Sequence, residues 1–195
     1  MRATLTCDVT AHRDALELAY AVTNGTDEEI GIFNWIEFKR PDGTLAFPQG
    51  TAYVELADRT LLVRKMALPK PDKLHIAAYL PPPASRIAAR GRFAERIVLP
   101  VPVRVMQPFR AALAGLANAG EVVADRPASA TTLRLEVGVF PLDASCKLVA
   151  EHPAHPAVFT PWPPGPAVAR QFVLTYDAAL QRSVEVLDYR SVPWP

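Results

Sequence analysis

The sequence predicts an all-β fold, and residues 15–38 carry most of that prediction. In residues 15–23 the apolar side chains recur at every second position, which is typical of a strand packed on one side. The apolar set is Leu16, Leu18, Tyr20 and Val22. Asn24-Gly25 and four polar residues follow, and a second apolar run begins at Ile30. Because Asn-Gly tolerates positive φ, we expect two strands joined by a tight turn in an antiparallel β domain.

Short runs of alternating or apolar character continue along the chain. They predict about nine or ten strands with one short helix over 108–120, in which Phe109, Leu113 and Leu116 share a face. The last two strands, 169–176 and 182–189, are expected to form a hairpin through a loop at 177–180. The predicted strands are 2–10, 15–23, 30–39, 51–56, 60–68, 74–80, 96–106, 132–140, 169–176 and 182–189.

Two of these strands have features that place them in the sheet. Residues 30–39 are apolar on both faces, as expected for a central strand or one covered by a loop. On one of these faces lie Phe33 and Trp35, for which two interpretations are open: a dimer contact, or burial beneath loops. Residues 96–106 carry Pro100 and Pro102 two positions apart, so this strand lacks two donors along one side and is predicted to be an edge strand.

Composition restricts the class of protein. The chain has 195 residues, of which 50% are hydrophobic, so we expect a single domain over residues 1–195 with a proline-rich loop at 153–166. A net charge of +1 argues against a nucleic-acid partner. The start of the chain has no apolar signal-peptide region, and prolines exclude 152–169 as a membrane helix. The expected location is the cytoplasm, with Cys7 as a buried thiol; a Cys7–Cys146 bridge is the alternative.

Closely spaced short strands with polar or proline turns predict a sandwich or a barrel. The opening strand, Asn24-Gly25 turn and second strand resemble an immunoglobulin-like or fibronectin-type sandwich. The antibody-type spacing of Cys, Trp and Cys is missing. The predicted fold class is therefore a single antiparallel β-sandwich of immunoglobulin-like appearance.

One candidate metal site lies in the 146–155 loop. Cys146, His152 and His155 are residue types that bind Zn or Cu, and His-x-x-His can bring two imidazoles to one metal. Each histidine precedes a proline, which favours extended backbone and separates the two rings. The alternative is a solvated polar loop.

Two candidate binding surfaces are aromatic or basic. Arg86, Arg90, Arg92 and Phe93 form a small basic cluster that could meet an anionic partner, or else an exposed hairpin turn solubilised by arginines. Trp162 and Trp194 lie between prolines, where an exposed indole can present a recognition face. The alternative for Trp162 is that it folds back to cap the sandwich.

These observations favour a non-catalytic binding or scaffolding module whose partner is another protein. No Gly-x-Ser-x-Gly motif, phosphate loop or convincing acid–base pair is present, and no cofactor is implied. A weak metal-binding protein using the 146–155 loop is the alternative function, and an unrecognised enzyme is the third.

Overall fold

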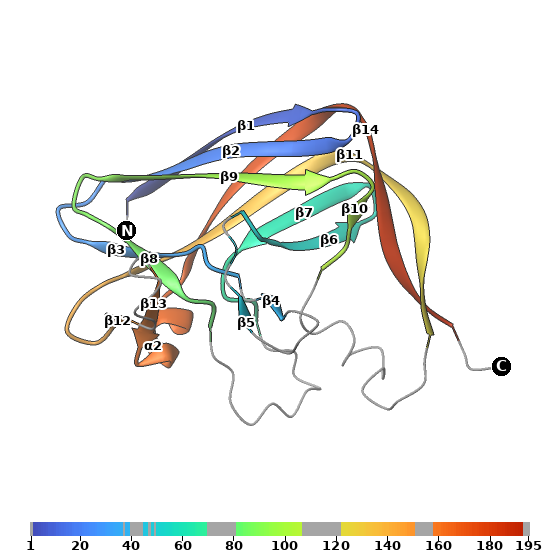
Figure 1. Cartoon of the computed structure of the whole chain (residues 1–195). Coiled ribbons are helices and arrows are strands. Elements are labelled where there is room, and N and C mark those ends of the chain that lie inside the picture. The colour runs from blue at the N-terminus through green and yellow to red at the C-terminus, as the bar shows by residue number, and fades with distance from the viewer. Residues whose placement is uncertain are drawn as a thin grey trace.

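The computed structural model describes residues 2–36, 38–39, 45–46, 48, 50–69, 81–106, 122–150 and 158–192. The all-β prediction is confirmed, because this part of the chain is nearly all strand with one short helix, α2 (Pro164–Ala169). The strands form open, mixed sheets (Figure 1). The strand predicted at 74–80 and the helix predicted at 108–120 lie outside the described residues.

A three-stranded antiparallel sheet contains the N-terminal strands. Its order is β1 (Ala3–Ala11), β2 (Ala15–Asn24) and β9 (Arg92–Pro100). The alternation predicted for β1 and β2 is present, with Leu16 and Leu18 fully buried and Glu17 and Ala19 turned away from them. The first two predicted strands are therefore correct to within one residue at each end.

A larger mixed sheet contains most of the remaining strands, in the order β10-β14-β11-β3-β8-β13-β12. The strand β7 joins it by parallel pairing with β11, and β6 pairs with β7. A separate pair is formed by β4 (Phe38–Lys39) and β5 (Leu45–Ala46). The bounds in the larger sheet are β3 Ile30–Phe33, β6 Tyr53–Ala57, β7 Thr60–Lys65, β8 Ala84–Ile87, β10 Val103–Arg104, β11 Val122–Pro141, β12 Lys147–Ala150, β13 Phe159–Trp162 and β14 Phe172–Val192.

Two predictions about strand pairing were wrong. Parallel pairs join β7 to β11 and β10 to β14, so the domain is not purely antiparallel. In addition, β2 and β3 do not form a hairpin, because β2 belongs to the small sheet and β3 to the large one. The polar residues 25–29 connect the two sheets instead of closing a turn within one sheet.

The predicted hairpin at 177–180 is also wrong, because β14 is one continuous strand. Its inward side chains alternate through the predicted loop, from Leu174 to Leu180, and the alternation resumes at Val184 after three exposed residues. The long neighbouring strand β11 pairs with it along its length, with one register shift between Ala130 and Thr132. Asp177 pairs with Arg134 on β11 and does not initiate a turn.

The predicted edge strand 96–106 is divided in two. The strand β9 ends at Pro100 and has β2 as its described partner, so it lies at the edge of the small sheet as expected. Residues 101–102 then lead the chain into β10, at the edge of the large sheet. The two prolines therefore lie where the chain passes from one sheet to the other. Proline has no N–H to donate to a neighbouring strand, so it is tolerated at such a position.

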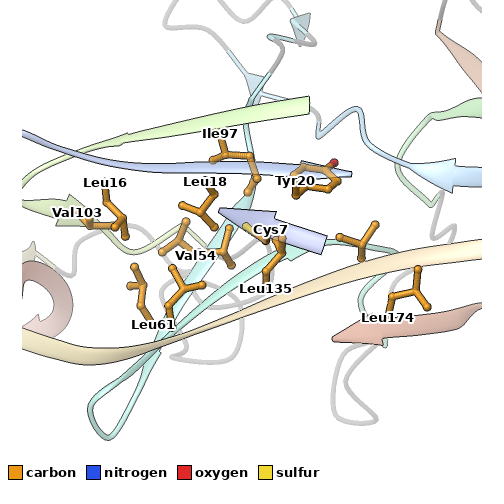
Figure 2. Close-up of a cluster of buried hydrophobic side chains, with 14 of the residues drawn as sticks. Cys7, Leu16, Leu18, Tyr20, Val54, Leu61, Ile97, Val103, Leu135 and Leu174 are labelled. Carbon is orange, nitrogen blue, oxygen red and sulfur yellow. The ribbon is translucent and has the colours of Figure 1, made fainter. Parts of the chain in front are cut away.

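The main core lies where the inward face of the small sheet packs against β6, β7, β11 and β14 (Figures 1 and 2). Cys7 is buried in this core, and both cysteines are free, so the disulfide alternative is excluded. Figure 2 shows apolar side chains from both sheets meeting one another, including Leu18 and Ile97 from one sheet and Leu61 and Leu135 from the other.

Asn24 fixes the two connections that run between the sheets. Its buried amide nitrogen donates to the carbonyl oxygens of Glu28 (2.7 Å) and Ala88 (2.9 Å). Its amide oxygen accepts from the backbone and the hydroxyl of Thr26. The Asn24 side chain thus holds the 25–29 and 88–91 connections together, and each of these connections runs from one sheet to the other.

A second core lies under β3, where glycine admits an aromatic ring. Gly31 is directly opposite Phe140, and a Cβ added at Gly31 would lie 2.2 Å from the Phe140 ring. The rings of Phe33 and Phe140 are 4.6 Å apart between centroids. Trp35 is buried and donates to the Ser85 hydroxyl at 3.0 Å. The dimer-contact interpretation of Phe33 and Trp35 is therefore wrong, because both side chains are buried. The central position is confirmed for Ile30–Phe33, whereas the predicted strand 30–39 is too long.

We expect Gly31→Ala to lower the free energy of unfolding by about 1–3 kcal/mol, because the new methyl overlaps the Phe140 ring. Urea denaturation measures the change. The control is Gly165→Ala, where no heavy atom lies within 4 Å of the added Cβ, and alanine favours helix α2. Equal urea midpoints for the two variants would contradict this packing.

Candidate functional site

The most prominent polar cluster of the described residues joins the two sheets inside the protein. Lys65 on β7 is fully buried, and its Nζ donates to Glu95 Oε1 on β9 at 2.9 Å. Tyr20 on β2 is opposite Glu95 in register and donates its hydroxyl to Glu95 Oε2 at 2.5 Å. Backbone groups complete the cluster: Lys65 Nζ donates to the Asn34 carbonyl at 2.6 Å, and the Gly50 N–H donates to Glu95 Oε1 at 3.0 Å.

The electrostatics of this cluster are those of a closed ion pair. Burial lowers the pKa of Lys65, while the neighbouring Glu95 carboxylate opposes that effect. Burial raises the pKa of Tyr20 well above its usual range, and the negative charge of Glu95 adds to the increase. The carboxylate therefore accepts from a neutral phenol, an ammonium and a backbone amide at once. Such a cluster fixes the position of two sheets, and its reactive atoms are already hydrogen-bonded.

Sequence reasoning missed this cluster, although a signal for it exists. Lys65 continues the inward positions of Leu61 and Val63, and Glu95 lies in phase with inward Ile97. A charged residue in phase with buried apolar residues predicts a buried charge, which requires a partner. What the sequence does not give is that these two positions face each other across the core.

The predicted basic cluster is dispersed over two sheets. Arg86 on β8 pairs with Glu29 at 3.4 Å, and Arg90 pairs with Asp27 at 2.8 Å. Phe93 points inward, 6.2 Å between ring centroids from Tyr20.

Arg92 remains on the outer face of the small sheet. It lines a shallow hollow of about 370 Å³ floored by alanines, and Arg96 beside it pairs with Glu17. Arg92 is therefore the one arginine of the predicted cluster that forms no ion pair with another described residue.

Cys146, the one described member of the predicted metal site, lies in the second core beneath β12. It is 1% exposed, and burial raises the pKa of its thiol, whereas a metal ligand must be a thiolate. His152 and His155 lie outside the described residues, as does Trp194. The described part of the chain contains no group of three or more metal-ligating side chains. The metal site stays a prediction, and the structure adds nothing in its favour.

Trp162 lies on an exposed surface formed by β12 and β13. Trp162 is 62% exposed and lies opposite Lys147 in the strand register, while Val149 is 51% exposed and lies opposite Thr160. Residues directly opposite, or two apart along a strand, share one face of a sheet. We call these four residues, Lys147, Val149, Thr160 and Trp162, the Trp162 surface. The indole therefore does not fold back over the core.

Contacts on either side hold the Trp162 surface in place. Leu148 and Cys146 are turned to the other side, into the second core. Arg170, after α2, donates to Asp143 Oδ2 at 2.6 Å and to the Ser145 hydroxyl, which joins the helix to the turn before β12. The hydrogen bond from Arg170 lowers the pKa of the Asp143 carboxyl, and the bonds that the Ser145 hydroxyl and N–H donate to Asp143 lower it further.

Gln171 extends this support to the large sheet. Its side-chain oxygen accepts from the Ala67 N–H at 2.9 Å, and its nitrogen donates to the Ala67 carbonyl at 3.1 Å. Gly138 leaves room for that side chain, since a Cβ there would lie 2.3 Å from Gln171 Oε1. The exposed indole thus lies on a pair of strands anchored to the rest of the fold.

Comparison with known proteins gave no relative: no family model, no curated protein and no solved structure matches this chain. Among the described residues, no helix is long and apolar enough to cross a membrane.

We expect Glu95→Gln to lower the free energy of unfolding by about 3–5 kcal/mol, because it leaves the Lys65 ammonium buried without a counter-charge. The double variant Lys65→Met/Glu95→Gln should recover much of this loss. Asp27→Asn, which breaks the exposed pair with Arg90, is the control and should cost less than about 1 kcal/mol. A loss in Glu95→Gln no larger than in the control, measured by urea denaturation, would contradict the buried pair.

Both thiols should be slow to react in the native protein. Burial raises the pKa of Cys7 to about 11, so at pH 8 it stays protonated, and Cys146 is buried with its pKa also raised. We expect a disulfide reagent such as DTNB to titrate neither thiol rapidly at pH 8, and to titrate both at once in guanidinium chloride. Rapid reaction of either thiol with DTNB in the native protein would contradict its burial in the core.

Proposed function

We propose that this protein is a non-catalytic binding module that engages another protein through the Trp162 surface. One observation carries the proposal: a tryptophan that is 62% exposed lies on the same face as a half-exposed valine, on strands anchored by side-chain hydrogen bonds. Tryptophan is enriched at protein interfaces, where it supplies a large part of the binding energy.

The described ionisable groups support a non-catalytic role. In the Lys65–Glu95–Tyr20 cluster, Lys65 and Tyr20 are buried and the Glu95 side chain is 9% exposed, at a hollow in the outer face of the small sheet, and each of these polar groups has a partner. A hollow of about 540 Å³ on the outer face of β7, β11 and β14 contains Arg134 and Asp177, which pair with each other at 2.7 Å. Asp58 also lines this hollow, but no histidine, cysteine, lysine or serine lines it beside that carboxylate. Neither place therefore brings a free acid, base and nucleophile together in an open cleft, as many catalytic sites do.

The proposal uses the two packed sheets as a scaffold of the β-sandwich type. Loops and terminal hairpins of such scaffolds commonly carry recognition while the packed layers supply rigidity. The two free, buried thiols fit a reducing compartment such as the cytoplasm.

We expect Trp162→Ala to weaken binding of the cellular partner at least tenfold, because it removes the largest apolar group of the surface. The partner is first captured with the wild-type protein and identified by mass spectrometry, and its affinity for purified variants is then measured by biolayer interferometry. The control is Val98→Ala, which truncates another half-exposed apolar side chain, on the small sheet.

Both substitutions should leave the urea midpoint almost unchanged, since both side chains are largely exposed. Unchanged affinity of the Trp162→Ala variant, or an equal loss in Val98→Ala, would contradict the proposed surface.

A further inference from the structure

The strand β12 is the last strand of the large sheet. It pairs with β13 along one side, from Lys147–Trp162 to Ala150–Phe159. No strand among the described residues pairs with its other side. Its outer N–H and C=O groups therefore form an edge directly beside the exposed Val149 and Trp162.

We propose that the partner supplies an extended segment that adds to this free edge of β12 as a further strand, and that the segment carries an acidic residue among apolar ones. This inference rests on the proposed function and names the mode of binding at the same surface. In such an arrangement main-chain hydrogen bonds provide affinity, and alternate side chains of the segment provide specificity. Its apolar side chains would lie next to Val149 and in reach of Trp162.

Charge selects the chemistry of the segment. Lys147 is exposed on the Trp162 surface, and no described carboxylate pairs with it. The strands β12 and β13 carry no acidic residue of their own, since their sequences are Lys-Leu-Val-Ala and Phe-Thr-Pro-Trp. A second copy of the chain pairing through β12 would bring one Lys147 towards another without a counter-charge. A foreign segment with an aspartate or glutamate satisfies Lys147, so charge complementarity favours it over self-association.

The β9 edge of the small sheet does not offer the same site. The residue Gly50 lies against β9, where a Cβ would be 2.8 Å from the Arg96 carbonyl oxygen, and its N–H is bonded to Glu95. The strand also ends in Pro100, which has no N–H to donate. Strand addition is therefore more readily accommodated at β12 than at β9.

Synthetic peptides test the inference without knowledge of the partner. The probe is Ac-Val-Thr-Asp-Thr-Val-Thr-amide, in which the aspartate and both valines lie on one face of the strand, and its matched version has lysine in place of aspartate. Two further versions of the acidic probe carry backbone N-methyl groups, one on the odd and one on the even positions. In an added strand, alternate N–H groups face the sheet and the others face solvent, so N-methylation of one set alone should abolish binding.

We expect the acidic probe to shift the amide NMR signals of β12 and to bind at least tenfold more tightly than the lysine version. Lys147→Glu should reverse this preference, and Arg92→Glu, at the other sheet, should not. One N-methylated probe should lose binding at least tenfold while the other keeps it.

Three results would overturn strand addition: absence of binding at millimolar probe, equal affinity of both N-methylated probes, or self-association of the free protein through β12 in sedimentation experiments. If these occur while Trp162→Ala still weakens partner binding, the proposed function stands and only the binding mode is wrong. If Trp162→Ala leaves partner binding intact, the proposed function itself is wrong.

Discussion

The buried ion pair between Lys65 and Glu95 is the interaction on which the arrangement of the two sheets depends. Apolar contacts between sheets are non-directional and tolerate small shifts, whereas a buried charge must meet its partner at hydrogen-bond distance. The 2.9 Å contact, together with the Tyr20 hydroxyl, fixes β7 against β9 and β2. We infer that this cluster sets the relative position of the layers, while the surrounding aliphatic core supplies most of the stabilisation.

The same constraint explains where recognition is possible. Lys65, Glu95 and Tyr20 join the sheets inside the protein, and Asn24, at the end of β2, ties the two connections that cross between the sheets. The far end of the large sheet is anchored differently, by Arg170 on Asp143 and by Gln171 on the Ala67 backbone. That end combines fixed geometry with an exposed indole and a strand edge that no described strand pairs with, and the proposed binding function rests on this combination.

Local patterns predicted local structure well and long-range pairing poorly. Period-two alternation located β1, β2 and the second half of β11, and apolar character on both faces identified β3 as central. The same alternation runs through residues 177–180, which lie within β14, although Asp177-Ala178-Ala179-Leu180 has the look of a hairpin loop between two strands. The sheet to which each strand belongs depends on contacts distant in sequence, so the crossing after Asn24 and the parallel pairing of β7 with β11 could not be predicted.

Site prediction had the same limit. The prolines on either side of Trp162 predict a candidate binding residue. The register of β13 with β12 then places its indole on an exposed face. The arginines are close in sequence, but the chain changes sheet between Arg86 and Arg92 and separates them.

The central claim is that Lys65 is a structural ammonium and not a reactive amine, and ¹⁵N NMR of lysine side chains tests it most directly. The account predicts a slowly exchanging Lys65 ammonium signal near neutral pH that is lost or shifted in Glu95→Gln. A Lys65 signal with the shift of a neutral amine, or with exchange as fast as that of exposed Lys147, would contradict it and would favour an enzyme.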